Sequence, residues 1–169
     1  MMSEKILKGR AFKFGDSIST DLIVPGKYAH LRSNLPELAR HVLEDADPAF
    51  VNNVNDGDFI VAGKNFGLGS SREHAPLAIK MAGVSAVLAK SVARIFFRNA
   101  INLGLPILLC NTDTINAGDE LEVNLATGVI TDYTNQTELS FNKIPQVMLD
   151  ILNEGGLIPY IHKYGDFKL

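Results

Sequence analysis

A glycine-rich turn followed by two serines and an arginine is the part of this sequence best suited to chemistry. Gly67 and Gly69 can adopt positive φ and let the backbone approach a ligand closely. Ser70, Ser71 and Arg72 follow at the expected start of a helix, where the first backbone N–H groups have no partner within the helix. The planar guanidinium of Arg72 can bind a carboxylate through two hydrogen bonds. The turn is therefore predicted to hold an anion.

The same residues also have a purely structural interpretation. Ser70 and Glu73 have the spacing of a capping box, in which each side chain bonds the backbone N–H of the other residue at the start of a helix. Such a cap explains both residues without any ligand. A cap requires neither the glycines nor Arg72, and these favour the anion site. Both interpretations remain open.

The other residues that commonly bind metals are dispersed. The four histidines stand at positions 30, 41, 74 and 162, without the spacing of a helical metal site, and Cys110 is the only cysteine. The chain alone therefore offers no disulfide, no cysteine-held cluster and no metal site, and any metal chemistry must come from a partner. His74, Arg94 and Arg98 are interpreted as packing, structural or subunit-interface residues.

The composition indicates one globular domain. The 169 residues are 46% hydrophobic and 21% charged, and the net charge of −3 argues against a nucleic-acid partner. No apolar run approaches the ~20 residues of a membrane span, and the first residues lack the apolar segment of a secretory signal. We therefore expect a cytoplasmic protein.

The elements that position the turn form an alternating pattern. Strands are predicted at 59–62, 85–89 and 106–109, with helices at 75–82 and 93–103 between them. Strands joined in this way lie parallel through right-handed crossovers, and ligands tend to bind near their carboxyl ends.

The two ends of the chain differ from this middle part. A strand at 8–14 precedes a loop at 27–34, and a helix is predicted from Pro36 to about 45–48. Alternating residues around Thr127 and Gly128 predict a hairpin of strands 118–125 and 129–131. A last helix at 145–154 is followed by a short tail. The expected fold is one α/β domain, residues 1–169, with a mixed sheet.

Two segments together resemble a known family. They are Gly15–Asp21, which reads GDSISTD, and 63–106, which contains GSSREH and RIFFRN. The chain resembles the small subunit of 3-isopropylmalate dehydratase, the separate-chain counterpart of the aconitase swivel domain, over nearly its whole length. The resemblance implies a swivelling β/β/α fold and a large subunit that carries a [4Fe-4S] cluster, with which this chain forms a heterodimer or a higher assembly.

The resemblance also implies a reaction. The family isomerises hydroxy acids by removing water from one carbon and adding it to the next. The iron of the partner's cluster acts as a Lewis acid on the departing hydroxyl, while the small subunit supplies a base and groups that bind carboxylates.

Particular residues match the family's functional positions. By resemblance, Ser70 is the alkoxide base, and Ser71 and Arg72 contact a substrate carboxylate. Asp21 matches an aspartate that orients a catalytic histidine of the other domains and raises its pKa. Its alternative interpretation is an aspartate in a solvated turn or at a helix N-cap.

Arg32 matches a further substrate-binding arginine in the loop where the family selects its substrate. An inward Arg32 favours a third carboxylate, because a guanidinium buried against an alkyl group is costly. An inward Leu31 or Tyr28 favours an alkyl group, and Arg32 could instead lie on the surface.

Three functions follow from these residues. The first is isomerisation of 2-isopropylmalate and 3-isopropylmalate in leucine biosynthesis. The second is the same chemistry on homoaconitate or 2,3-dimethylmalate. The third is a stand-alone module that binds an anionic metabolite without a partner.

Overall fold

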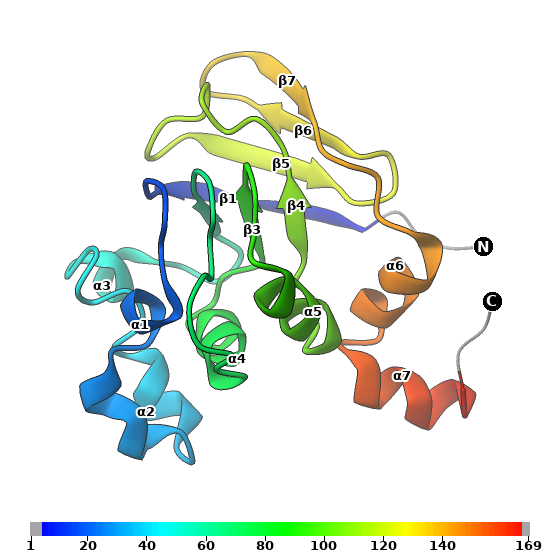
Figure 1. Cartoon of the computed structure of the whole chain (residues 1–169). Coiled ribbons are helices and arrows are strands. Elements are labelled where there is room, and N and C mark those ends of the chain that lie inside the picture. The colour runs from blue at the N-terminus through cyan, green and yellow to red at the C-terminus, as the bar shows by residue number, and fades with distance from the viewer. Residues whose placement is uncertain (1–4, 167–169) are drawn as a thin grey trace.

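A mixed sheet organises the computed structural model, which describes residues 5–166. Within these residues seven strands lie in the order β4-β3-β2-β1-β5-β6-β7. Strand β1 (Ile6–Lys13) pairs along its first part with antiparallel β5 and along its last part with parallel β2. β1 therefore joins a parallel half to an antiparallel half, and the predicted mixed sheet is confirmed (Figure 1).

The parallel half has the predicted alternation of strands and helices. Its strands are β2 (Phe59–Val61), β3 (Ala86–Ala89) and β4 (Ile107–Leu109), joined by α4 (His74–Met81) and α5 (Arg94–Asn102). All residues of β2 and β3 are buried, because helices cover one face of these strands and the antiparallel strands lie over the other.

The antiparallel half lies as a separate layer at the top of Figure 1. It contains β5 (Glu120–Asn124), β6 (Val129–Asp132) and β7 (Thr137–Ser140). The hairpin of β5 and β6 was predicted and is confirmed. Strand β7 was missed, because its sequence TELS is mostly exposed and polar and gives no apolar alternation.

Short helices fill the connection between β1 and β2. They are α1 (Thr20–Ile23), the 3₁₀ helix η1 (Gly26–Leu31), α2 (Leu35–Ala39) and α3 (Phe50–Asn53). The prediction of a helix from Pro36 to 45–48 was wrong, since α2 ends at Ala39. Leu43 has a φ of 58°, and its N–H donates to the carbonyl of Ile23 instead of to a helical partner.

Two helices close the chain. α6 (Gln146–Asn153) agrees with the prediction, whereas the expected short tail was wrong, because residues 157–164 form α7 (Leu157–Tyr164). Pro159 obscured this helix in the sequence. It lies in the first turn of α7, where a missing N–H costs no helical hydrogen bond.

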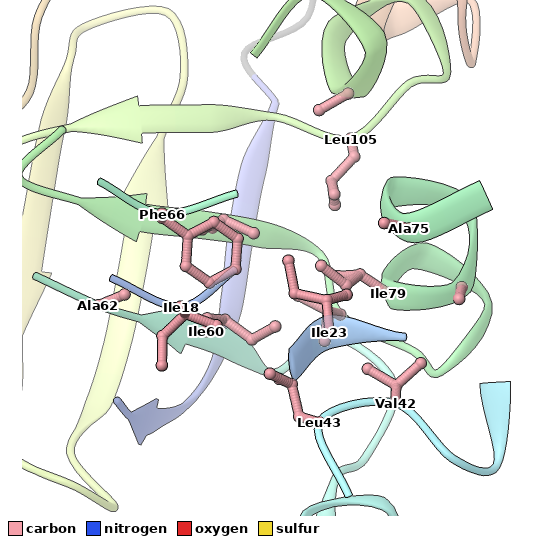
Figure 2. Close-up of a cluster of buried hydrophobic side chains, with 14 of the residues drawn as sticks. Ile18, Ile23, Val42, Leu43, Ile60, Ala62, Phe66, Ala75, Ile79 and Leu105 are labelled. Atoms are coloured by element: carbon pink, nitrogen blue, oxygen red, sulfur yellow. The ribbon is translucent and has the colours of Figure 1, made fainter. Parts of the chain in front are cut away.

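Two apolar clusters stabilise the sheet from opposite sides. In Figure 2, Ile18, Ile23, Ile60 and Ile79 meet between the parallel strands and the helices α1 and α4. The second cluster joins the other face of β2 and β3 to Leu121, Val123 and Ile130 of the antiparallel strands. Neighbouring residues of one strand thus enter different cores, as the alternation of side chains along a strand requires.

Candidate active site

The two sequence motifs run side by side in space. The N–H groups of Ser17 and Thr20 donate to the carbonyls of Lys64 and Leu68 over 2.7 and 2.9 Å, and the N–H of Gly67 donates to Ile18 over 2.7 Å. The two segments leave the neighbouring parallel strands β1 and β2, and Figure 1 shows them running together toward α1 and α4. This pairing brings residues near positions 20 and 70 together.

The glycine turn has the backbone that the sequence predicted. Gly67 has a φ of 78° and Gly69 a φ of 105°, in a region that favours glycine. A Cβ atom on Gly67 would lie 2.3 Å from the ring of Phe96 in α5. The glycine at 67 is therefore required by close packing as well as by φ, and this packing holds the start of α5 beside Ser70.

The capping-box interpretation was wrong. Helix α4 begins at His74 with Glu73 at its N-cap, so Ser70 lies outside the helix. The Oγ of Ser70 instead lies 3.3 Å from the Oγ1 of Thr20 and accepts a hydrogen bond of 3.0 Å from the Nε of Arg72. The expectation that the helix opens at Ser70 to Arg72 was also wrong. The N–H of Ala75 donates to Arg72 and Pro76 has none, so the start of α4 offers few free donors.

Arg72 is the centre of a small polar network. Its Nη2 lies 2.5 Å from the Oδ1 of Asp21, its Nη1 donates to the carbonyl of Val24 over 2.9 Å, and its Nε donates to Ser70. These three contacts fix the guanidinium plane and link two predicted site residues, Asp21 and Ser70. The Asp21 side chain remains 68% exposed, so a partner can reach it.

Asp21 occupies the first turn of α1. The N-cap is Ser19, whose Oγ accepts from the N–H of Leu22, so the alternative in which Asp21 is the cap was wrong. The aspartate therefore faces Arg72 with both carboxylate oxygens free of a capping role.

A cavity of about 230 Å³ opens beside this network. Ser70, Ser71 and Arg72 form one side of it, and the N-terminal half of α5 forms another, with Arg94, Ile95 and Asn99 in the lining. Sequence reasoning missed the contribution of α5. The signal available was that α5 follows β3, the strand next to β2, so its start lies beside the glycine turn.

The predicted site residue Arg32 lies apart from this cavity. It is exposed at the end of η1 and is absent from the residues that line the cavity, and Tyr28 stacks on His41 with ring centroids 3.8 Å apart. Arg32 does lie near His74, whose pKa is lowered chiefly by burial and further by the charges of Arg72 and Arg32. The imidazole of His74 is therefore neutral at neutral pH.

Comparison with known proteins decides the family. The model of the aconitase C-terminal domain matches residues 21–112. The 3-isopropylmalate dehydratase small subunit 2 of Archaeoglobus fulgidus is 65% identical over 161 residues, 95% of this chain and 98% of that protein. The chain belongs to the family of 3-isopropylmalate dehydratase small subunits. A further member, small subunit 1 of Thermotoga maritima, is 58% identical over 96% of this chain and 98% of its own length.

A solved structure confirms the fold of this family. The 3-isopropylmalate dehydratase of Methanocaldococcus jannaschii superposes with a TM-score of 0.92 at 45% identity, covering 95% of this chain and 96% of that one. The expected α/β fold of the swivelling family is thereby confirmed. The same organism has an isopropylmalate/citramalate isomerase small subunit that is 52% identical over 94% of this chain and 95% of its own.

Residues 5–166 contain neither a cluster of metal-binding side chains nor a membrane-spanning helix. No three His, Cys, Asp or Glu side chains in this part of the chain come together where they could hold a metal ion. No helix within the same residues is long and apolar enough to cross a bilayer.

Proposed function

We propose that this chain is the small subunit of a hydro-lyase that interconverts 2-isopropylmalate and 3-isopropylmalate in leucine biosynthesis. The observation that carries the proposal is the network of Asp21, Arg72 and Ser70 at the edge of one cavity. The names of the relatives support the substrate and the need for a large subunit. The proposal places the enzyme in the cytoplasm.

Ser70 is the base in this proposal. A serine hydroxyl is too weak an acid to be ionised in water, so its alkoxide needs donors aimed at the oxygen. The Nε of Arg72 supplies a charged donor at 3.0 Å, and the hydroxyl of Thr20, at 3.3 Å, can donate as well. Both groups stabilise Ser70 when it has lost its proton. Ser70 then takes the proton from the carbon next to a substrate carboxylate.

Ser71 and Arg72 bind that carboxylate. Arg72 is held in place by Val24 and Ser70, so its orientation does not depend on the substrate. The carboxylate of Asp21 lies on the same guanidinium in the isolated chain. When the large subunit closes over the cavity, Asp21 turns to a histidine of that subunit and leaves room on Arg72 for the substrate.

The partner supplies what this chain lacks. The proposal places the [4Fe-4S] cluster on the large subunit, since Cys110 is the only cysteine of the sequence. Such a cluster provides a Lewis acid for the hydroxyl that leaves the neighbouring carbon. The small subunit positions the substrate and removes the proton.

The lining of the cavity favours an alkyl-substituted substrate. Ala93, Ile95 and Phe96 form an apolar wall next to Ser70, and Arg32 lies outside this lining. A third carboxylate, as in homoaconitate, therefore has no assigned partner in the cavity. 2,3-Dimethylmalate, which has two carboxylates and small alkyl groups, remains an alternative. Citramalate is a second candidate substrate, because a relative at 52% identity is named for both isopropylmalate and citramalate.

A turnover assay tests the proposal. The chain is mixed under anaerobic conditions with its cluster-bearing large subunit and offered 3-isopropylmalate, citramalate, homoisocitrate and 2,3-dimethylmalate. The unsaturated intermediate is followed in the ultraviolet. We expect the highest kcat/KM with 3-isopropylmalate. Preference for homoisocitrate would contradict the assignment of an alkyl wall.

The stand-alone binding module requires a different result. Such a module binds its ligand without a partner, so calorimetry on the isolated chain would detect 3-isopropylmalate at micromolar affinity. We expect weak binding by the isolated chain and turnover only with the large subunit. Tight binding alone, without turnover in the mixture, would favour the module.

A further inference from the structure

We propose that Arg94 binds the second carboxylate of the substrate. This inference rests on the proposed function and extends it to a residue on a different element. A malate derivative has two carboxylates, and one cation cannot hold both in a bidentate manner. A second positive group is therefore needed, and Arg94 lies in the lining of the cavity.

The contacts of Arg72 set the need for this second group. A guanidinium has five N–H bonds, and the contacts with Asp21, Val24 and Ser70 use three of them. If Asp21 moves away from Arg72, the guanidinium can bind one substrate carboxylate through an N–H of Nη2 and the second N–H of Nη1. The bonds to Val24 and Ser70 remain and fix its direction. Val24 and Ser70 use two of the five N–H bonds and a bidentate carboxylate uses two more, so Arg72 cannot bind a second carboxylate in the same way.

Arg94 is placed to meet the other carboxylate. It is the first residue of α5, its side chain is exposed, and it makes no hydrogen bond or ion pair with another residue between 5 and 166. It lines the same cavity as Ser70 and Arg72. A free arginine facing a cavity that already holds a base and a carboxylate-binding arginine is suited to an anionic substrate.

The position of Arg94 is fixed by packing that does not involve its side chain. The N–H of Ala93 donates to the carbonyl of Phe66 over 2.9 Å, and the rings of Phe66 and Phe96 meet edge to face at 5.4 Å. Phe96 also lies against Gly67, where a Cβ atom would collide with it. The start of α5 is therefore held rigidly beside the glycine turn, and Arg94 is held beside Ser70.

Arg98 offers a matched control on the same helix. It also lacks a hydrogen bond or ion pair with the part of the chain that the structure describes, but it lines only the neighbouring groove of about 580 Å³ between α5 and α6. Arg94 lies at the border of the cavity and this groove. Removal of either charge changes the net charge of the helix equally, whereas only Arg94 faces the cavity.

The test compares Arg94→Gln with Arg98→Gln in the complete enzyme with its large subunit. Loss of a charged hydrogen bond to a carboxylate is expected to raise the KM for 3-isopropylmalate ~10- to 100-fold in Arg94→Gln. Arg98→Gln should leave KM within about twofold, and Arg94→Lys should recover part of the loss, since it keeps the charge but not the fork. Subunit affinity is measured for each variant by sedimentation.

The outcomes separate the inference from the proposed function. An unchanged KM in Arg94→Gln, with normal turnover by the wild-type enzyme, would overturn the role of Arg94 and leave the function intact. Weakened subunit binding with an unchanged KM would overturn it as well and assign Arg94 to the interface. Absence of wild-type turnover on every substrate would count against the proposed function itself.

Discussion

Two aspartates, Asp21 beside the parallel half of the sheet and Asp132 in the antiparallel half, have opposite environments. Beside the parallel half, Asp21 contacts Arg72 and its side chain is 68% exposed, so a partner can reach it. In the antiparallel half, Asp132 is fully buried and Asp119 nearly so, and both accept hydrogen bonds from Asn135. The first arrangement leaves a charge available, and the second encloses it.

This difference follows from how each half is built. The segments that leave β1 and β2 are long and hydrogen-bond to each other, so their polar side chains contact residues far away in the sequence, as Thr20 contacts Ser70. The antiparallel strands are joined by short turns, and their polar residues bond near neighbours, as Asn135 bonds Asp132. The contacts of Asp21, Arg72 and Ser70 join separate segments beside a cavity, whereas those of Asp132 and Asn135 hold one turn together.

Ser70→Ala should have the largest effect among the variants that test the functional role of the polar network. The variant removes the proposed base, and we expect kcat to fall by roughly 10³-fold, since a positioned base contributes about 10² to 10⁴. The side chain is exposed, so the free energy of unfolding should change little. Steady-state kinetics of the complete enzyme and denaturant titration measure the two quantities.

Ser71→Ala is the control for this variant. The neighbouring serine is proposed only to bind a carboxylate, so its loss should raise KM by about tenfold and leave kcat within a few-fold. A near-normal kcat in Ser70→Ala would show that the base lies elsewhere. Equal losses of kcat in both variants would show that neither serine acts alone.

Gly67→Ala tests the packing between the glycine turn and α5. The new Cβ meets the ring of Phe96 at 2.3 Å, at a φ of 78°, so both overlap and backbone strain apply. We expect a loss of about 2 to 4 kcal/mol in the free energy of unfolding. Urea titration measures it.

Gly118→Ala is the matched change outside the site. Gly118 precedes β5, has a φ of 85°, and a Cβ atom there would meet nothing within 4 Å. Only the strain of about 1 kcal/mol should remain. If both variants lost the same stability, Phe96 would be free to move, and the rigid placement of α5 would be wrong.

The sequence predicted the parallel half well because its signals are local. The apolar runs that form β2, β3 and β4 are bounded by turns, and Gly83 and Gly104 end the helices with φ of 108° and 84°. The helix from Pro36 was predicted too long for the opposite reason. Leu43 has helical spacing in the sequence, but its N–H donates to the carbonyl of Ile23. This contact joins distant residues, and no local sequence pattern predicts it.

The site was predictable only where it is contained in one segment. The positive φ of Gly67 and Gly69 agrees with the prediction from the sequence. The neighbouring contribution of Arg94 depends on Phe96 lying against Gly67, and such a contact between separate elements is invisible in the residue pattern. The catalytic roles of Asp21 and Ser70 stay predictions until the variants are measured.

Asp132→Asn probes the enclosed carboxylate through the pH dependence of the free energy of unfolding. Burial, and then a hydrogen bond with Asp119, raise the pKa of Asp132 above its ordinary value of 3.8. The folded state therefore holds this proton more tightly than the unfolded state does. Its contribution to stability is complete below pH 3.8 and is lost as the pH rises through the folded-state pKa. Asparagine does not titrate. The free energy of unfolding of the variant relative to the wild type should therefore increase as the pH rises from 3.8 through the folded-state pKa of Asp132, and then level off.

Asp113→Asn should show the reverse sign and so completes the comparison. Asp113 is exposed and paired with Lys90, whose hydrogen bond lowers the pKa of the carboxyl. The contribution of Asp113 to stability is present above its ordinary pKa and is lost as the pH falls. The wild type should therefore have a larger free energy of unfolding than this variant at neutral pH, and the difference should disappear in acid. Urea titrations at several pH values measure both differences. If the free energies of unfolding of Asp132→Asn and the wild type changed in parallel with pH, Asp132 would ionise as readily in the folded protein as in the unfolded chain. The contrast between Asp132 and Asp21 would then consist only of a difference in exposure.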